Sequence, residues 1–231
     1  MEELEAGLYL VSTPIGNLED ITLRALRVLR QADLIAAEDT RRTFKLLKVY
    51  EIEKPLTSYH DHNKERKAPR LIEEMRKGKK VALVSDAGTP GISDPAYHLV
   101  RMALQEGMKV VPIPGPSAPI AAIQVSGLPP DRFAFEGFLP RKKGKRDRRL
   151  EELREEKRTI ILFEAPHRLL PSLRSILEIL GDRRAAICRE LTKRFEEVLR
   201  GTVSELIGEV EKREPRGEMV VVVEGRCAAR Q

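Results

Sequence analysis

The sequence predicts an α/β protein with two αβα lobes. Short apolar runs alternate with helix-like segments along the 231 residues, as in α/β domains. The chain is also longer than the roughly 150 residues of an average domain, and the pattern restarts near residue 117. We therefore expect an N-terminal lobe over residues 1–116 and a C-terminal lobe over residues 117–231, joined near residues 112–117.

Four apolar runs predict the strands of the first lobe: residues 8–11, 34–37, 81–84 and 110–111. Asp20 is expected to cap a helix after the first strand, and Asp39 stands at the start of a basic helix after the second. After the third strand, Asp94 is placed as an N-cap, with Pro95 at the first helical position.

The second lobe opens with an apolar helix that Ser117 is expected to cap. Its predicted strands are residues 159–163, 185–188 and 219–223. Between the first two strands, a helix is expected to run to Leu180 and to end at Gly181. Thr202 and Glu205 fit a capping box at the start of a later helix.

Three loops that follow strands share one composition, rich in glycine, proline and small hydroxyl residues: residues 12–17, 85–91 and 114–118. One such loop alone would be a tight turn, but three at the carboxyl ends of strands predict a ligand site. The sequence has neither a GxGxxG nor a GxxxxGK[ST] motif, and these loops contain no lysine. A nucleoside-like ligand without phosphates therefore fits best, and S-adenosylmethionine is such a ligand.

Charge and composition limit the function classes. The formal net charge is +6, no apolar run approaches the length of a membrane span, and the N-terminus is acidic. We expect a cytosolic chain. Cys188 and Cys227 are expected to be reduced thiols. His60 and His62 form an HxH pair without a third ligand nearby, so no metal site is expected.

Six segments together resemble one family: VSTPIGNL (11–18), EDTR (38–41), SDAGTPGISDP (85–95), PGPSA (114–118), GFLPRKKG (137–144) and RELTK (189–193). The sequence is similar, from about residue 7 to residue 224, to the ribosomal RNA small subunit methyltransferase I family, a branch of the tetrapyrrole methylase superfamily. The resemblance implies S-adenosylmethionine-dependent methylation of the ribose 2′-oxygen of a cytidine in 16S ribosomal RNA, near the decoding centre. It also implies a cofactor cleft between two lobes and a homodimer.

The resemblance also implies site residues. The expected cofactor contacts in and around the first lobe are Pro14, Asp86, Ala87, Gly88, Thr89, Ile92, Ser117 and Ala118. From the second lobe, Glu164 and Leu191 take the corresponding strand-end positions. Many family members continue past this chain's end with a small helical region, so RNA would here be held by the two lobes alone.

A ribose hydroxyl is a poor nucleophile, and a general base would accelerate its attack about 10²–10⁴-fold. The candidates are Glu38, Asp39, Glu164, Glu190 and Lys193. The carboxylates could instead cap helices or pair with arginines, and the sequence does not decide between these roles.

A basic stretch follows three phenylalanines in the second lobe and contains one acidic residue, Asp147. Its cations are Arg141, Lys142, Lys143, Lys145, Arg146, Arg148 and Arg149. We expect them, and the first five in particular, to bind RNA phosphates. The alternative is a solvated helix whose charges pair with Glu151, Glu152, Glu155 and Glu156. Aromatic residues make up 4% of the chain, which argues against a broad stacking platform.

Two other functions remain possible on the sequence alone. One is methylation of a tetrapyrrole, although the first loop lacks the Gly-Pro-Gly-Asp type usual in those enzymes. The other is a non-catalytic ribosome-binding factor that keeps the fold. The partner expected from the leading hypothesis is 16S ribosomal RNA or the small ribosomal subunit.

Overall fold

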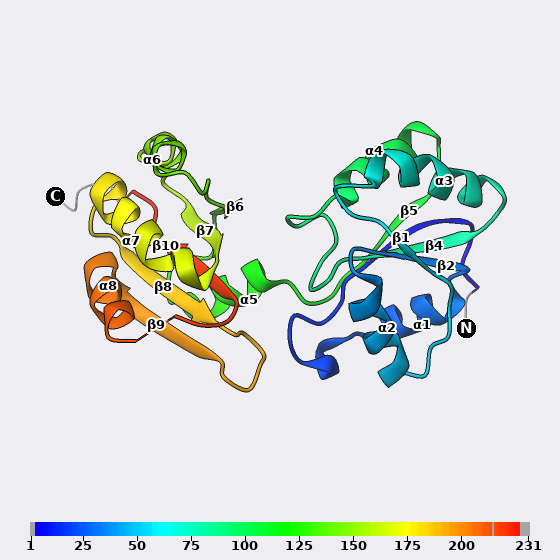
Figure 1. The fold of residues 1–231 in the computed structure, drawn as a ribbon, viewed down its shortest axis with the longest axis horizontal. Coiled ribbons are helices and arrows are strands. Elements are labelled where there is room, and N and C mark those ends of the chain that lie inside the picture. Colours follow the sequence, from blue (N-terminus) through cyan, green and yellow to red (C-terminus); the bar gives the residue numbers. More distant parts are fainter. Residues whose placement is uncertain (1–2, 214, 227–231) are drawn as a thin grey trace. The chain divides into compact units, whose positions relative to one another are not determined.

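The computed structural model describes residues 3–213 and 215–226 (Figure 1). The chain divides into two compact units, Met1–Ser117 and Ala118–Gln231, and each has its own five-stranded sheet. An α/β fold was expected, and the two sheets with their helices confirm it.

The first unit has one parallel sheet with the strand order β3-β2-β4-β1-β5. Its strands are β1 (Gly7–Val11), β2 (Leu34–Ala37), β3 (Leu56–Ser58), β4 (Lys80–Val84) and β5 (Val110–Ile113). Its helices are α1 (Leu23–Gln31), α2 (Thr40–Val49), α3 (Lys64–Arg76) and α4 (Ala96–Gln105). One core cluster packs α1 and α2 on one face of the sheet, and another packs α3 and α4 on the opposite face. The central strands are therefore buried on both faces, which explains their continuous apolar runs.

The second unit has a mixed sheet with the order β6-β7-β10-β8-β9, because β6 and β7 pair in parallel and the other three neighbouring pairs are antiparallel. Its strands are β6 (Phe133–Phe138), β7 (Thr159–Glu164), β8 (Arg184–Arg189), β9 (Glu197–Thr202) and β10 (Met219–Val223). Its helices are α5 (Ala118–Ser126), α6 (Lys143–Glu152), α7 (Pro166–Leu180) and α8 (Val203–Glu211). The main core lies between the sheet and helices α6, α7 and α8, and α5 contacts β7, β8, β9 and β10.

Local signals predicted several boundaries correctly. All five residues of β10 are buried, as its unbroken run of apolar residues indicates. The Thr202 side chain and the Glu205 side chain form the predicted capping box of α8. Helix α7 ends at Gly181, which adopts a φ of 88° that most side chains disfavour.

Three predictions about helix ends and strands need correction. Thr22, not Asp20, caps α1, because Asp20 lies in a short 3₁₀ turn before the helix. Helix α4 begins at Ala96, so Pro95 is its N-cap, although the Asp94 carboxylate still accepts the Ala96 N–H at 2.8 Å. Strand β5 continues through Pro112, which an edge strand tolerates because Pro112 needs no ladder donor there.

Candidate functional site

The carboxyl ends of β1 and β4 form a topological switch point in the first sheet. These strands are neighbours, but the chain leaves β1 toward α1 on one face and β4 toward α4 on the other. Loops that diverge in this way leave a crevice at the strand ends, where open α/β sheets bind ligands. Two of the three loops predicted from composition, residues 12–17 and 85–91, begin at this point.

The two loops are bonded to each other. Thr13 and Gly88 exchange both backbone hydrogen bonds, at 2.9 and 3.0 Å. The Ser12 hydroxyl lies 3.0 Å from the Thr89 hydroxyl, and Thr89 donates to the carbonyl of Pro116 in the third loop. Three loops far apart in sequence are therefore held as one rigid edge.

Two glycines let these loops approach closely. Gly88 has a φ of 82°, and a Cβ there would lie 3.2 Å from Ile15 Cγ2. A Cβ at Gly115 would lie only 2.8 Å from the Ser12 Cβ. The exposed residues of these loops include the small residues Ala87, Gly91 and Gly115. Such an edge fits a ligand that is recognised by backbone groups, as expected for S-adenosylmethionine.

Asp86 holds the neighbouring loop in place. Its carboxylate accepts the backbone N–H of Asp39 at 2.8 Å, and Arg42 Nη1 lies 3.5 Å away. Asp39 itself caps α2 and bonds Arg41 with both carboxylate oxygens. The Arg41 hydrogen bonds hold the pKa of Asp39 far below its ordinary value. Asp39 is therefore an unsuitable base, since it binds a proton weakly.

Glu38 has the opposite character. Its carboxyl is half-buried, and burial, together with the carboxylates of Asp86 and Asp94, raises its pKa above the ordinary 4.5. Burial likewise raises the pKa of Asp94, whose carboxylate accepts the N–H groups of Gly91 and Ala96. The first unit holds two of the five candidate bases, Glu38 and Asp39. Of these two, Glu38 is the one whose pKa is raised.

A pocket of about 280 Å³ lies beside this edge. Pro14 and Asp86 line it, and they are the two predicted cofactor residues that do so. Sequence reasoning missed the contribution of α2, whose lining residues are Arg42, Thr43, Lys45, Leu46 and Val49. Four of these follow the i, i+3, i+4, i+7 spacing of one helix face, and this spacing is the signal that could have identified them.

In the second unit, both carboxylate oxygens of Glu164 accept hydrogen bonds from neighbouring residues. It ends β7 at 4% exposure, and Ser172 and the backbone N–H of Ala165 donate to its two oxygens. Arg168 Nε lies 3.3 Å from the same carboxylate. Because both oxygens are engaged and the side chain is buried, the Glu164 carboxylate serves as a structural hydrogen-bond acceptor in this unit.

The segment after β8 is held in an uncommon conformation. Leu191 is 8% exposed and stands between Glu190 and Thr192, which have φ values of 50° and 66°. Positive φ is rare for a β-branched residue such as threonine. Glu190 accepts the Lys193 ammonium at 2.9 Å and the Glu218 N–H at 2.8 Å. Burial alone would raise the pKa of Glu190, but these hydrogen bonds outweigh it and lower the pKa. Burial alone would lower the pKa of Lys193, but its bonds to Glu190 and Glu218 raise it. Neither group is therefore suited to act as a base.

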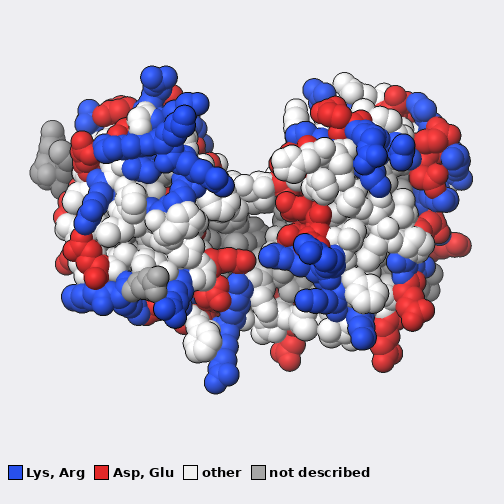
Figure 2. Space-filling view, viewed as in Figure 1, with Lys and Arg blue, Asp and Glu red and all other residues white. Residues whose placement is uncertain are grey.

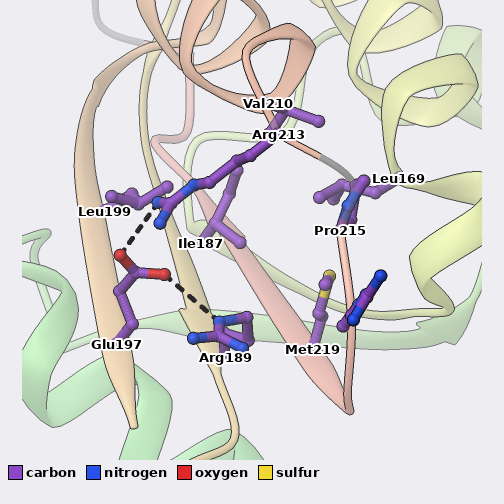
Figure 3. Close-up of a pocket in the computed structure, with 10 residues that line it drawn as sticks. Leu169, Ile187, Arg189, Glu197, Leu199, Val210, Arg213, Pro215 and Met219 are labelled. Carbon is purple, nitrogen blue, oxygen red and sulfur yellow. Dashed lines mark hydrogen bonds and ion pairs between the residues drawn. The ribbon is translucent and has the colours of Figure 1, made fainter. Parts of the chain in front are cut away.

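A smaller pocket of about 140 Å³ lies over the second sheet (Figure 3). Its apolar wall includes Ile187 and Met219. Glu197 bridges the two arginines labelled in the figure, at 3.2 Å from Arg189 Nε and 2.8 Å from Arg213 Nη2. None of the predicted site residues lines this pocket.

The basic stretch forms α6 and the loop before it, and blue side chains gather over this helix in Figure 2. Arg146 does not belong to that surface. Its side chain is buried against α7, and its Nε donates to the Ser175 hydroxyl at 3.0 Å, while Ser175 donates to Asp147. Arg146 was expected to contact RNA, but the structure buries its side chain, because its position on the helix points toward the core.

Two further cations of the stretch are neutralised. Lys143 pairs with Asp147 and Glu178, and Arg149 pairs with Glu136 and Glu152. Four exposed cations have no acidic partner among the described residues: Arg141, Lys142, Lys145 and Arg148. We call these four the free cations. Of the four glutamates in the alternative reading, Glu152 pairs with Arg149 of the stretch, whereas Glu151, Glu155 and Glu156 pair with arginines outside it.

The described residues contain neither a candidate metal cluster nor a candidate membrane helix. Within residues 3–213 and 215–226, no group of three or more His, Cys, Asp or Glu side chains could hold a metal ion. Over the same residues, no helix is both long and apolar enough to cross a membrane. Cys227 lies outside the described residues.

Comparison with known sequences gave strong matches. Residues 7–207 match the family described as Tetrapyrrole (Corrin/Porphyrin) Methylases. The chain is 54% identical over 219 residues to the ribosomal RNA small subunit methyltransferase I of Thermotoga maritima, covering 95% of this chain and 98% of that protein. It is 52% identical over 228 residues to the protein of the same name from Escherichia coli O157:H7, covering 97% of this chain and 79% of that one.

Solved structures are similar in fold. A diphthine synthase has a TM-score of 0.71 at 19% identity and covers 94% of this chain and 89% of its own. The uroporphyrin-III C-methyl transferase of Thermus thermophilus, complexed with S-adenyl homocysteine, has a TM-score of 0.66 at 20% identity. That match covers 94% of this chain and 97% of the other. At these identities, the structural matches support the fold alone.

Proposed function

Because this chain belongs to the tetrapyrrole methylase family, we propose that it transfers a methyl group to the ribose 2′-oxygen of a cytidine in 16S ribosomal RNA. The observation that carries this proposal is the identity of about one half to relatives named ribosomal RNA small subunit methyltransferase I. The tetrapyrrole enzymes are similar at 24% identity or less. The ribosomal RNA reaction is therefore favoured over the tetrapyrrole one.

The cofactor is S-adenosylmethionine, which carries the methyl group on a positively charged sulfonium. Its proposed contacts in the first unit are Pro14, Asp86, Ala87, Gly88, Thr89, Ile92 and Ser117, and those in the second unit are Ala118, Glu164 and Leu191. The bridge between Thr13 and Gly88 supports the first-unit part of this set, since it fixes the loop backbone before the ligand arrives. Fixed positioning is the main requirement of an in-line transfer and can supply roughly 7–11 kcal/mol.

Glu38 is the proposed general base. Asp39, Glu190 and Lys193 are paired, and Glu164 has both oxygens engaged, whereas Glu38 is half-buried beside the loops and has a raised pKa. A carboxylate of this kind removes the proton from the attacking hydroxyl at neutral pH without being trapped by a cation.

The free cations are the proposed contacts for RNA phosphates. Each carries a positive charge that no acidic side chain in the described part of the chain pairs with, and a negatively charged polymer is the partner that such a surface attracts. The proposed target lies near the decoding centre, and the proposed substrate is 16S ribosomal RNA or the small ribosomal subunit. We propose a cytoplasmic location, because ribosomal RNA is found there. We further propose a homodimer, which sedimentation would test.

The direct test uses labelled S-adenosylmethionine and small ribosomal subunits that lack this methylation. We expect one labelled ribose 2′-oxygen in 16S ribosomal RNA and heat of cofactor binding in calorimetry. Label on a base, or on a tetrapyrrole supplied in parallel, would contradict the proposed substrate. Absence of cofactor binding would instead indicate a non-catalytic ribosome-binding factor.

A further inference from the structure

Three of the six phenylalanines of the chain gather at one place, and the first of the free cations follows three residues after the last of them in β6. Phe138 ends β6 and is 53% exposed. Its ring lies 5.4 Å from the ring of Phe163, which in turn lies 5.0 Å from Phe135 in an edge-to-face arrangement. Phe163 is half-buried, and the exposed ring of Phe138 packs against it. The low aromatic content of the whole chain, 4%, gave no indication of this local cluster of rings.

An irregularity in strand pairing places Phe138 there. Phe135 pairs with Ile161 but Gly137 pairs with Leu162, so Glu136 is one extra residue in β6. In an uninterrupted strand, residues three apart point to opposite faces. The extra residue brings Phe138 to the face of Phe135 and Phe163 instead. Bulges of this kind often aim a side chain at a functional site.

The bulge is held from the basic helix. Arg149 of α6 donates to the carboxylate of Glu136 through Nε at 3.0 Å and Nη2 at 2.5 Å. Three residues on from Glu136, the chain is anchored again, because Leu139 is buried and its carbonyl accepts a hydrogen bond from Arg168. Two fixed points therefore flank the exposed ring.

The free cations begin three residues after Phe138, at Arg141 and Lys142. An exposed ring beside cations without acidic partners is the combination that binds unpaired nucleic acid, since bases stack on the ring and the cations meet the phosphates. A symmetric contact centred here with a second copy of the chain would bring the same positive charges together, which disfavours that occupant.

On this basis, which rests on the proposed function, we propose that Phe138 stacks against an unpaired base of the RNA substrate. The ring then acts as a specificity element for single-stranded or splayed-out RNA, whereas the free cations supply binding that is independent of base identity. Glu136 and Arg149 are positioning residues, since they set the direction of the ring without contacting RNA.

The test measures binding of a 16S ribosomal RNA fragment to the full chain at several salt concentrations. Phe138→Ala is expected to weaken binding about 5- to 150-fold with an unchanged salt slope, whereas Phe138→Trp stays within about threefold of the wild type. Phe44→Ala is the matched control, because it removes a ring of similar exposure, 59%, from α2. It should leave RNA binding unchanged.

A second arm identifies the base. RNA fragments with single abasic positions should include one that wild type binds as weakly as Phe138→Ala does, and the two losses should not add. Unchanged RNA binding by Phe138→Ala would overturn the inference, and so would a reduced salt slope or dissociation of an oligomer by that variant. If wild type transfers no methyl group yet Phe138→Ala still loses RNA binding, the proposed function fails and the stacking site stands.

Discussion

Thr13 and Gly88 are joined by two backbone hydrogen bonds, at 2.9 and 3.0 Å, across 75 residues of sequence. The bridge links the loop after β1 to the loop after β4 at the switch point of the first sheet. Together with the hydrogen bond between Ser12 and Thr89, it joins two loops rich in Gly and Pro at the carboxyl edge of the sheet.

Gly88→Ala is expected to damage cofactor binding. The alanine would have to adopt a φ of 82°, and its Cβ would lie 3.2 Å from Ile15 Cγ2, so both the strained backbone and this tight contact act against the geometry of the bridge. We expect at least a tenfold loss of S-adenosylmethionine affinity in calorimetry. Gly78→Ala is the control, since Gly78 has a φ of 88° but open space around it. It should lower stability by about 1–2 kcal/mol and leave cofactor affinity unchanged. Equal effects of the two variants on affinity would contradict the role of the bridge.

Glu164→Ala should reveal a structural carboxylate. The substitution leaves Arg168 without its buried partner and Ser172 without its acceptor, and breaking a buried pair typically costs about 3–5 kcal/mol. Urea denaturation would measure the loss of unfolding free energy. Glu211→Ala removes the partner of Arg174 in an exposed pair, so its effect should stay within about 0.5 kcal/mol. A Glu164 variant with wild-type stability would refute this assignment.

Neutralising part of the basic surface should weaken RNA binding electrostatically. Arg141, Lys142 and Lys145 replaced together by Ala should reduce the slope of log affinity against log salt by about 2. The control variant replaces Arg76, Lys77 and Lys79 with Ala. It removes the same positive charge, but in the wild type these three cations already pair with glutamates. A control triple that reduces the slope equally would show that net charge, rather than the free cations, governs binding.

Glu38→Gln should inactivate the protein while stabilising it. The carboxyl of Glu38 has its ordinary pKa near 4.5 when unfolded and a raised pKa when folded, mainly through burial. Between these two pH values the folded state holds more protons, so the free energy of unfolding falls as pH rises. Ionised Glu38 therefore destabilises the fold at pH 7, and the variant should melt at a higher temperature there than wild type, with little difference at pH 4.

The same variant should lose about 10²–10⁴-fold in methyl transfer if Glu38 is the base. In wild type, the rate should rise with pH through the raised pKa of Glu38. Asp86→Asn removes one of the carboxylates that raise this pKa and should move the midpoint to lower pH. A Glu38→Gln variant that keeps the acidic limb of the wild-type profile would exclude Glu38 as the base.

Cys188 should resist thiol reagents in the native protein. Its side chain is 1% exposed, its Sγ faces the carbonyl of Ala122, and burial raises its pKa to about 12. At pH 8 only about 10⁻⁴ of the thiol is ionised, and the thiolate is the reactive form. In a Cys227→Ser background, Ellman's reagent should label no thiol until the protein is unfolded. Rapid labelling of the folded variant would contradict the burial of Cys188.

The sequence by itself determined the features that depend on neighbours along the chain. The buried run of β10, the capping box at Thr202 and the stop at Gly181 each follow from a few adjacent residues. The ordered motifs likewise indicated the family and a cofactor without phosphates. Edge strands β3, β6 and β9 escaped prediction, because half-buried strands carry no continuous apolar pattern.

Only the tertiary structure decided which side chains are available for chemistry. The burial of Arg146 depends on Ser175, 29 residues away, and the Thr13 bridge depends on a loop 75 residues away. The direction of Phe138 depends on one extra residue in the register of β6 against β7. Such features arise from contacts between distant segments, whose energies no local pattern encodes, and they separate the four free cations from the three that the fold uses for itself.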